Sequence, residues 1–470
     1  LWGADGKPLA VVEAKKTRVD PDVGKHQAKL YADCLENQFG RRPIIFYTNG
    51  YNTWLWDDTE YPPREVQGFY EQDELQWLVN RRGTKLDLTT LQPDSNITAR
   101  YYQIEAAARV MQNYEVEKRR RALIVMATGS GKTRLSMSIV DMLMKGNRVR
   151  RVLFLADRIA LVNQAKREYG IHLKNVSTAS LLDKGSGEAR VVFSTYPTML
   201  NLIDGSKKDQ SETYSVGHFD LIIIDEAHRS VYQKYGAIFE YFDSLILGLT
   251  ATPRGEVDRN TYRLFKLQDH QPTYAYELEQ AVADEFLVPP KALSVPLKFP
   301  RDGIKYHELS PEEQEEYEQE EQFYDEETGK LKEEISSSAL NQWLFNEDTV
   351  DKVLMHVMEN GIKIDGGDSL GKTIIFAKNK NHADFIVKRF DHHYPKLAGK
   401  FCQKLDYSVK YVQNLINTFS LPDNSPQIAV SVDMLDTGID VPDVVNLVFF
   451  KIVRSKTKFW QMIGRGTRLR

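Results

Sequence analysis

A glycine-rich turn between two regular elements is the clearest chemical feature of the sequence. An apolar run precedes it, a helical pattern follows it, and it consists of Ala127-Thr128-Gly129-Ser130-Gly131-Lys132-Thr133. Glycines let backbone N–H groups close around phosphate oxygens, and the start of a helix adds favourable partial charge. We expect Lys132 to neutralise the β- and γ-phosphates of a nucleotide and Thr133 to hold Mg²⁺. The turn therefore predicts a site for ATP and Mg²⁺.

An acidic pair lies further along the chain, directly after another apolar run. Asp225-Glu226-Ala227-His228 follows Leu221–Ile224. An acidic pair at the carboxyl end of a buried parallel strand lies beside the phosphates of a bound nucleotide. We expect Asp225 to hold the metal and Glu226 to polarise the attacking water. His228 would connect this site to a second lobe.

Continuous apolar runs separated by helical patterns are typical of strands buried on both faces of a parallel sheet. The runs expected to form strands are 123–126, 152–155, 191–193, 221–224 and 245–249, and later 373–376, 428–431 and 444–449. Helices are expected over 132–145, 158–169 and 380–390. The fold class is therefore α/β, with two doubly wound parallel-sheet domains in tandem.

The glycine-rich turn and the acidic pair resemble those of the DEAH-type superfamily-2 ATPases, and further motifs of that family follow in order. The resemblance extends over residues 98–470 and implies two RecA-like domains. The matching motifs are Tyr102-Gln103, Leu249-Thr250-Ala251-Thr252-Pro253, Asp436-Thr437-Gly438-Ile439-Asp440-Val441-Pro442 and Gln461-Met462-Ile463-Gly464-Arg465-Gly466-Thr467-Arg468. By this resemblance Gln103 recognises adenine, and Gly438 and Asp440 contribute to nucleotide binding.

The last of these motifs supplies the candidate catalytic side chains of the second domain. The resemblance implies that Arg465 and Arg468 act as arginine fingers, with Gln461 beside them. Removing an arginine finger costs on the order of 10³ in rate. The alternative for Arg465 is a surface charge near the end of the chain.

Two further residues follow predicted strands and match nucleic-acid-facing motifs of the same family. They are Arg158, in Ala156-Asp157-Arg158, and Thr195, in Ser194-Thr195-Tyr196. Such groups hold phosphates and therefore do not recognise a base sequence. A capping or solvated arginine is the alternative for Arg158.

The first block of the chain, residues 1–90, indicates a small α/β unit. We expect a strand over 8–12, a helix over 24–38, and a hairpin around Asn49-Gly50. The strand ends in Glu13-Ala14-Lys15, and residues two apart on a strand share one face. Restriction-type nucleases use such a Glu to bind Mg²⁺ and such a Lys to stabilise charge. Gln27 and Tyr31 resemble the accessory Q-x-x-x-Y motif of one nuclease branch.

A nuclease-like block ahead of a DEAH-type motor resembles the restriction (R) subunit of type I restriction-modification enzymes. Strings that support this resemblance are PLAVVEAKK, RALIVMATGSGKT, RVLFLADR and YAYELEQAVADEFLVPP. The resemblance implies ATP-driven translocation of double-stranded DNA, cleavage away from the recognition site, and methyltransferase and specificity subunits as partners. It also implies a catalytic Asp further upstream than Asp5, which lies too close to Glu13 on a glycine-rich turn. The family's C-terminal assembly region has no counterpart here.

Composition is compatible with this prediction but does not support it independently. The net charge is −4 and the pI about 6.3, which on their own do not favour a nucleic-acid binder. An acidic segment, Glu308–Glu334, lowers the total, while basic runs remain at 118–121, 148–151 and the last residues. We favour a solvated role for the acidic segment over a flap. Two distant cysteines and the lack of a long apolar run predict a cytoplasmic protein without a membrane span.

The sequence thus divides into an endonuclease-like domain with an incomplete start (1–90), a first motor domain (91–290), an acidic junction (291–345) and a second motor domain (346–470). Because the chain starts at Leu1, we expect it to be part of a longer protein. Two alternatives to a restriction subunit remain open. One is a DNA repair or RNA helicase with an unrelated N-terminal domain, and the other is a nucleotide-binding scaffold without motor activity.

Overall fold

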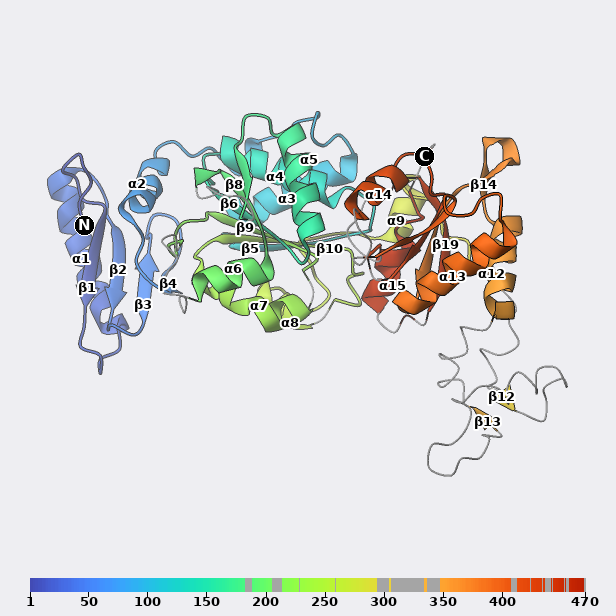
Figure 1. The fold of residues 1–470 in the computed structure, drawn as a ribbon. Coiled ribbons are helices and arrows are strands. Elements are labelled where there is room, and N and C mark those ends of the chain that lie inside the picture. Colours follow the sequence, from blue (N-terminus) through green and yellow to red (C-terminus); the bar gives the residue numbers. More distant parts are fainter. Residues whose placement is uncertain are drawn as a thin grey trace, which may run out of the picture. The chain divides into compact units, whose positions relative to one another are not determined.

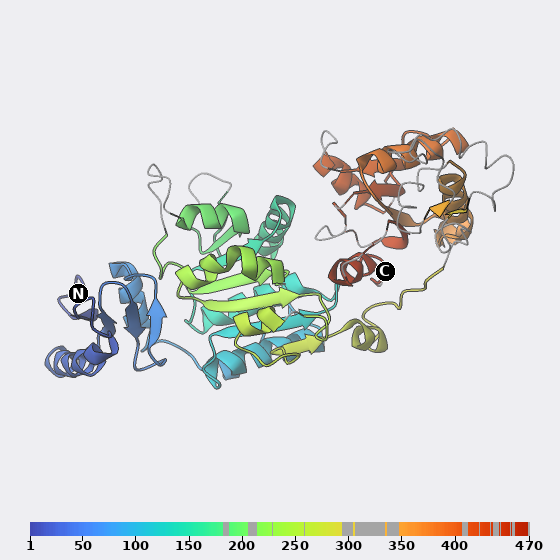
Figure 2. The same cartoon turned by 90° about the horizontal axis from the view of Figure 1, so that it is seen from below.

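The computed structural model describes residues 1–181, 188–204, 214–227, 229–257, 259–293, 304–305, 334–335, 347–406, 412–422, 424–432, 434–435, 441, 443–451, 453 and 456–468. The chain forms two compact units, Leu1–Ala283 and Asp284–Arg470 (Figures 1 and 2). Within the described ranges, no helix combines the length and the apolar character needed to cross a bilayer.

The first unit begins with a four-stranded sheet in the order β1-β2-β3-β4. β1 and β2 are parallel, and the other neighbours are antiparallel. α1 packs on one face through Ala28 and Ala32 against Ile45 and Tyr47. The elements of this part are β1 (Ala10–Ala14), α1 (Asp22–Phe39), β2 (Ile44–Thr48), β3 (Thr53–Trp56), β4 (Arg64–Val66), α2 (Gln72–Arg81) and the 3₁₀ helix η1 (Leu88–Thr90).

The hairpin predicted around Asn49-Gly50 is confirmed between β2 and β3. Gly50 has a φ of 91°, a left-handed conformation that favours glycine. The Asn49 side-chain oxygen accepts from the backbone N–H groups of Tyr51 and Asn52 at 3.0 and 2.9 Å. The turn is therefore fixed by its own side chain as well as by the strands.

A seven-stranded sheet in the order β11-β5-β10-β9-β6-β8-β7 forms the rest of the first unit. Every neighbouring pair is parallel. Figure 1 shows α3, α4 and α5 on one face and α6, α7 and α8 on the other. The predicted doubly wound arrangement is confirmed.

The elements of this part are α3 (Tyr101–Glu115), β5 (Arg121–Met126), α4 (Lys132–Lys145), β6 (Val152–Ala156), α5 (Ile159–His172), β7 (Thr178–Ser180), β8 (Val191–Thr195), α6 (Tyr196–Ile203), β9 (Leu221–Asp225), α7 (Arg229–Tyr241), β10 (Leu245–Thr250), α8 (Arg259–Leu264), β11 (Tyr274–Tyr276) and α9 (Leu278–Ala283). Strands β5, β6, β8, β9 and β10 are the predicted apolar runs, extended by one or two residues. Their residues are almost entirely buried because helices cover both faces.

The second unit contains a four-stranded parallel sheet in the order β17-β18-β16-β19. Its predicted strands and its helix from Lys380 are confirmed as β16, β18, β19 and α13. The described elements of this unit are β12 (Ile304–Lys305), β13 (Glu334–Ile335), α12 (Glu347–Asn360), β14 (Lys363–Ile364), η6 (Asp365–Gly367), β15 (Ser369–Leu370), β16 (Lys372–Ala377), α13 (Lys380–His393), β17 (Cys402–Leu405), α14 (Val412–Phe419), β18 (Ile428–Ser431), β19 (Val444–Phe450) and α15 (Lys456–Ile463).

The acidic segment Glu308–Glu334 lies outside the described residues except for its last residue, which belongs to β13. The preference for a solvated segment over a flap therefore stays a prediction.

Candidate ATP and nuclease sites

The glycine-rich turn follows β5 and leads directly into α4, as the sequence predicts. Gly129 and Gly131 have φ values of 84° and 90°. A Cβ on Gly131 would lie 2.3 Å from Nε2 of Gln103, so that only glycine fits both the backbone and the space. Lys132 begins the helix, and its Nζ donates to the backbone oxygen of Met126 at 3.2 Å. The first N–H groups of a helix have no acceptor within the helix, so those at the start of α4 can face a phosphate.

Two side chains of α3 stabilise this turn through hydrogen bonds to its backbone. Gln103 Nε2 and the Tyr102 hydroxyl each donate to the backbone oxygen of Ser130 at 2.9 Å. Gln103 is only 4% exposed. Its amide thus contacts the turn itself, and adenine recognition by Gln103 stays a prediction.

Sequence reasoning assigned no role to Tyr102 or to Tyr276. The two rings are stacked, with centroids 3.9 Å apart. Tyr276 ends β11 opposite Met126, and its backbone oxygen accepts from Ala127 N at 2.9 Å. The only signal in the sequence was the position of Tyr102 beside the motif glutamine.

The acidic pair ends β9, and Ala227 N donates to Leu249 O at 2.8 Å on the neighbouring strand β10. Since all strands are parallel, Asp225 and the glycine-rich turn lie at the same edge of the sheet. Burial and the adjacent Glu226 carboxylate raise the pKa of Asp225 to about 7, against the opposing effect of the Lys132 ammonium. Glu226 has a φ of 55°, an uncommon conformation for this residue type.

The donor set at this edge suits a magnesium nucleotide. Mg²⁺ prefers hard oxygen ligands and is usually held by one or two carboxylates together with phosphate oxygens. The Asp225 carboxylate and the Thr133 hydroxyl supply such oxygens. A cation would also offset the negative charge that raises the pKa of Asp225. His228 lies outside the described residues.

Arg158 follows β6 and Thr195 is the last residue of the adjacent strand β8, so both lie at the same edge. Thr195 precedes α6, and its hydroxyl oxygen accepts from Thr198 N at 3.4 Å. Arg158 Nε lies 3.4 Å from a carboxylate oxygen of Asp157, and the guanidinium is partly exposed. The structure thus brings both residues to one edge and gives Thr195 a capping contact as well.

The candidate arginine fingers belong to the second unit. Gln461 and Arg465 are 5% and 6% exposed, so the alternative that Arg465 is a solvated surface charge is wrong. Burial lowers the pKa of Arg468 to about 10. The backbone beside it is fixed by a hydrogen bond of 2.8 Å from Val288 N to Thr467 O. Gly438 and Asp440 lie outside the described residues.

The four candidate nuclease residues form one connected group on the face of the sheet that α1 covers. Lys15 Nζ donates to Glu13 Oε1 at 2.7 Å and to Gln27 Oε1 at 2.8 Å. Gln27 Nε2 in turn donates to the Tyr31 hydroxyl at 2.7 Å. The shared face of Glu13 and Lys15 was predicted from their spacing, and Gln27 and Tyr31 were singled out by their resemblance to an accessory nuclease motif; the contacts bring the two pairs together.

Gly24 makes this close packing of α1 possible. A Cβ there would lie 3.0 Å from Cγ of Glu13 and 3.3 Å from Cε of Lys15. Asp5 takes no part in the group, because its carboxylate accepts from Arg41 Nη1 at 3.0 Å. Glu13 therefore offers one carboxylate that could serve a divalent cation, with a cationic side chain directly beside it.

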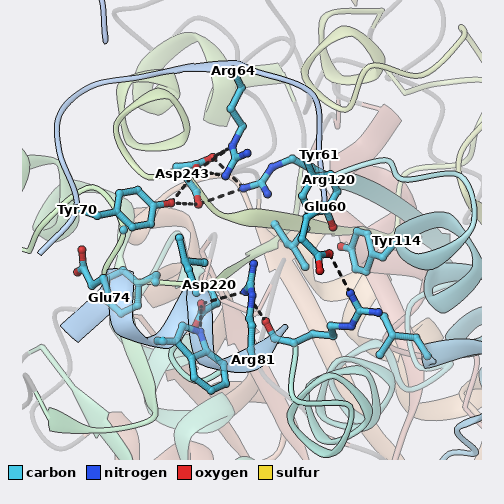
Figure 3. Close-up of a pocket in the computed structure, with 17 residues that line it drawn as sticks. Glu60, Tyr61, Arg64, Tyr70, Glu74, Arg81, Tyr114, Arg120, Asp220 and Asp243 are labelled. Carbon is cyan, nitrogen blue, oxygen red and sulfur yellow. Dashed lines mark hydrogen bonds and ion pairs between the residues drawn. The ribbon is translucent and has the colours of Figure 1, made fainter. Parts of the chain in front are cut away.

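A buried ionic network joins the small sheet to the amino edge of the seven-stranded sheet (Figure 3). Arg64 Nε and the Tyr70 hydroxyl donate to Asp243 at 2.8 and 2.7 Å, and Arg120 Nη2 donates at 2.8 Å. Burial alone would raise the pKa of Asp243, but the guanidinium groups of Arg120 and Arg64 outweigh it and hold that pKa well below its usual value.

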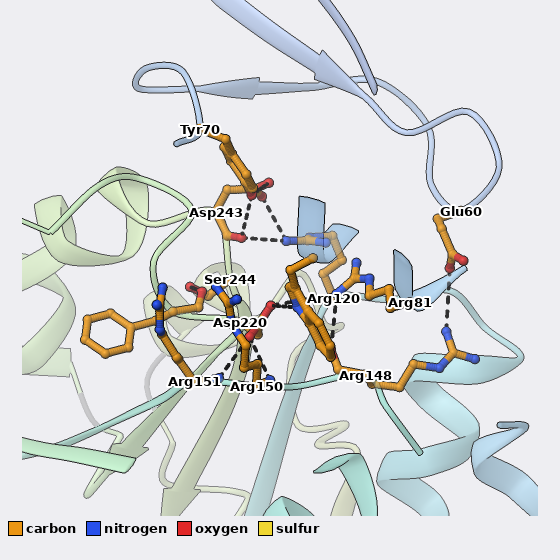
Figure 4. Close-up of polar contacts among 12 residues, drawn as sticks. Glu60, Tyr70, Arg81, Arg120, Arg148, Arg150, Arg151, Asp220, Asp243 and Ser244 are labelled. Atoms are coloured by element: carbon orange, nitrogen blue, oxygen red, sulfur yellow. Dashed lines mark hydrogen bonds and ion pairs between the residues drawn. The ribbon is translucent and has the colours of Figure 1, made fainter. Parts of the chain in front are cut away.

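The basic run at 148–151 belongs to the same junction (Figure 4). Arg148 lies 3.5 Å from Glu60, and Arg150 and Arg151 lie 3.0 and 3.2 Å from Asp73. The charges of this basic run thus pair with carboxylates that are distant in sequence.

Two family models match the chain. The model described as type III restriction enzyme, res subunit, matches residues 96–255, and the helicase conserved C-terminal domain matches residues 352–470. These matches fall on the seven-stranded sheet and on the second parallel sheet, respectively.

The chain is also similar to type I restriction enzyme endonuclease subunits from Escherichia coli. It is 27% identical to that of EcoKI from strain K12, over 98% of this chain and 45% of the relative, and 29% identical to that of EcoAI, over 100% and 57%. The chain thus spans about half the length of these relatives. A solved fragment of a candidate HsdR subunit of a type I restriction enzyme from Vibrio vulnificus YJ016 has a TM-score of 0.55 and 26% identity, over 98% of this chain and 78% of that one.

The two matched family models and the relatives that span nearly the whole chain agree. Over nearly its whole length the chain is similar to endonuclease subunits of type I restriction enzymes, and helicase-type family models match its two parallel-sheet domains.

Proposed function

We propose that the chain is the motor and endonuclease part of a type I restriction-modification enzyme. It hydrolyses ATP to translocate double-stranded DNA and cleaves that DNA away from the recognition site. The observation that supports this most directly is the presence, within one compact unit, of the glycine-rich turn with its acidic pair and of the Glu13–Lys15–Gln27–Tyr31 group. Methyltransferase and specificity subunits would recognise the target sequence.

The ATP site would act through the groups at the carboxyl edge of the seven-stranded sheet. Backbone N–H groups of Gly129 to Thr133 bind the phosphates, and the Lys132 ammonium leaves its contact with Met126 O to meet them. Thr133 and Asp225 would hold Mg²⁺, which would supply positive charge beside the phosphate oxygens. Glu226 orients and polarises the attacking water. The left-handed backbone at Glu226 is the kind of local strain that is found at functional sites.

The second domain would complete hydrolysis. Arg465 and Arg468 stabilise negative charge that develops on the transferred phosphoryl group, and Gln461 helps to position it. Gly438 and Asp440 contribute to nucleotide binding from the preceding motif. The burial of Gln461 and Arg465 suits groups that work in a water-poor site.

The nuclease site would use Glu13 as a Mg²⁺ ligand and Lys15 to stabilise charge at the scissile phosphate. Gln27 holds the Lys15 ammonium at 2.8 Å, and Tyr31 holds Gln27 at 2.7 Å. The contact with Gln27 would thus orient Lys15 even if Glu13 held a metal. Arg158 and Thr195 would contact DNA phosphates at the motor, without selecting a sequence.

A cleavage assay tests this proposal. In the complete enzyme, with its methyltransferase and specificity subunits, Glu13→Gln should abolish ATP-dependent cleavage of unmodified DNA and leave ATP hydrolysis unchanged. The matched control is Glu36→Gln, which removes an exposed carboxylate of α1 that pairs with Arg42. Normal cleavage by Glu13→Gln would contradict the nuclease assignment.

The match of residues 352–470 to a helicase domain leaves a second candidate, a DNA repair or RNA helicase. Separation of the strands of a labelled duplex, without any cleavage by the complete protein, would favour it.

We further propose domain limits of 1–90, 91–290, 291–345 and 346–470. The two cysteines, Cys34 and Cys402, are free, which suits the reducing cytoplasm in which we place the protein.

A further inference from the structure

A large groove lies at the junction between the small sheet and the seven-stranded sheet. Its volume is about 740 Å³, and its walls come from β3, the segment that leads into β4, and the amino ends of β5 and β10. The candidate ATP site lies at the carboxyl ends of the same strands. The groove is therefore a separate feature, on the opposite edge of the sheet from the nucleotide.

The lining of the groove is strongly basic. It includes three carboxylates, on Glu65, Glu240 and Asp243, and six cationic side chains, which are those of Arg64, Lys118, Arg119, Arg120, Arg121 and Lys266. Asp243 is already bound by Arg64 and Arg120. Lys118 and Arg119 also pair with carboxylates just outside the lining, at 3.3 Å from Glu115 and 3.3 Å from Glu117. The six cations of the lining still outnumber its three carboxylates, so an anion in the groove would be attracted.

The pKa of Lys266 reflects the positive charges that surround it in the groove. Burial, together with the nearby charges of Arg121 and Arg120, lowers the pKa of its ammonium group. Its neighbours in the groove repel it, so a bound anion would stabilise all three side chains together.

Aromatic side chains connect the groove to the candidate nuclease site. The lining includes Trp54, whose ring is parallel to that of Tyr47 with centroids 6.0 Å apart. Tyr47 lies opposite Glu13 in the ladder of β1 and β2. One end of the groove therefore adjoins the sheet face on which Glu13 and Lys15 meet.

We propose that this groove binds the phosphate backbone of double-stranded DNA and leads it from the first motor domain to the Glu13–Lys15 group. This proposal rests on the proposed function and names the path of its substrate. Arginine and lysine contacts to phosphate hold a duplex in register without selecting its sequence. A volume of about 740 Å³ accommodates a stretch of one backbone strand, while the rest of the duplex stays in solvent.

The test compares two double lysine variants of the full chain. Lys118→Gln with Lys266→Gln removes two groove cations, and Lys145→Gln with Lys174→Gln removes two cations that do not line the groove. Lys118 and Lys145 are matched, because each is about half exposed and pairs with one carboxylate of its neighbourhood. The probe is a labelled linear duplex without a recognition site, titrated at several salt concentrations.

The groove variant should bind the duplex about tenfold more weakly at low salt, and the slope of log K against log salt should fall by about 2, since each lost phosphate contact contributes about 0.9. The control variant should match the wild type. Duplex DNA should also protect Lys118 and Lys266, but not Lys145 and Lys174, from acetylation. ATP hydrolysis without DNA should be unchanged in both variants.

Each contrary result has its own meaning. If the groove and control variants bind equally and no lysine is protected, the groove proposal is overturned while the motor proposal stands. If RNA competes as well as duplex DNA and the groove variant loses both equally, the assignment to DNA is overturned. If the wild type binds no duplex at all, both the groove proposal and the proposed function fail.

Discussion

Each edge of the seven-stranded sheet carries a carboxylate whose pKa is shifted, and the two shifts have opposite directions. At the carboxyl edge, burial and Glu226 raise the pKa of Asp225 to about 7. At the amino edge, Arg64 and Arg120 hold the pKa of Asp243 well below its usual value. The first edge has an excess of negative charge that a cation can satisfy. At the second edge, the charge of Asp243 is balanced by the protein's own arginines, and this contact joins two parts of the chain.

This difference separates a site that awaits ligands from a structural junction. The carboxyl edge combines glycines at positive φ, the left-handed Glu226 and the start of α4. At the amino edge, Asp243 alone accepts from Arg64, Tyr70 and Arg120. Substitutions of the acidic pair should therefore affect catalysis, and substitution of Asp243 should affect stability.

The largest effect is expected for Glu226→Gln. The amide keeps the size of the side chain but cannot polarise water as a carboxylate does, so turnover should fall on the order of 10³-fold. ATP affinity should stay within about threefold of the wild type, because the phosphates are bound by the turn. Steady-state hydrolysis and nucleotide titration would measure the two quantities, and near-normal turnover would exclude Glu226 as the catalytic carboxylate.

Asp243→Asn, at the amino edge, should lower the free energy of unfolding. It leaves two buried guanidinium groups without their counter-charge, which costs about 3 kcal/mol of unfolding free energy. Asp73→Asn is the control, since Asp73 also pairs with two arginines but is exposed, and it should cost less than about 1 kcal/mol. Denaturant unfolding of the full chain would measure both. Equal losses would show that burial of the network does not matter.

A smaller effect is expected from the pH dependence of His218, which lies at the amino edge. Burial and then Arg151 lower its pKa to about 4, and its Nδ1 lies 3.4 Å from Arg151 Nη1. The folded pKa is below that of the unfolded chain, about 6.5, so its contribution is present above pH 6.5 and is lost as pH falls toward 4.

We expect this loss to be on the order of 1–2 kcal/mol, and His218→Gln should remove it. Unfolding midpoints of the wild type and the variant, measured between pH 7 and 4.5, would test this. Parallel curves for the two proteins would contradict the assignment.

The sequence predicted the parts of the molecule that depend on local pattern. The apolar runs before Thr128 and before Asp225 are long, continuous and followed by polar residues, so that strands and site residues could be placed together. Glu13 and Lys15, or Gln27 and Tyr31, are close enough in sequence for strand and helix periodicity to predict a shared face.

The junction could not be predicted in this way. Arg64 and Asp243 are separated by 179 residues, and no local signal pairs them. For the same reason the sequence shows that the run Arg148–Arg151 is basic but does not show its partners, which are Glu60, Glu115 and Asp73. The sequence shows how much charge a segment carries, and only the fold shows which of that charge is already paired.

The central claim is that ATP hydrolysis by this chain serves movement along double-stranded DNA. The most direct test is the rate of ATP hydrolysis without nucleic acid and with linear duplex DNA, single-stranded DNA or RNA, with Lys132→Ala as the control for the site. We predict that duplex DNA stimulates hydrolysis most strongly and that Lys132→Ala abolishes all of it. Stimulation by RNA or single strands alone would contradict the account.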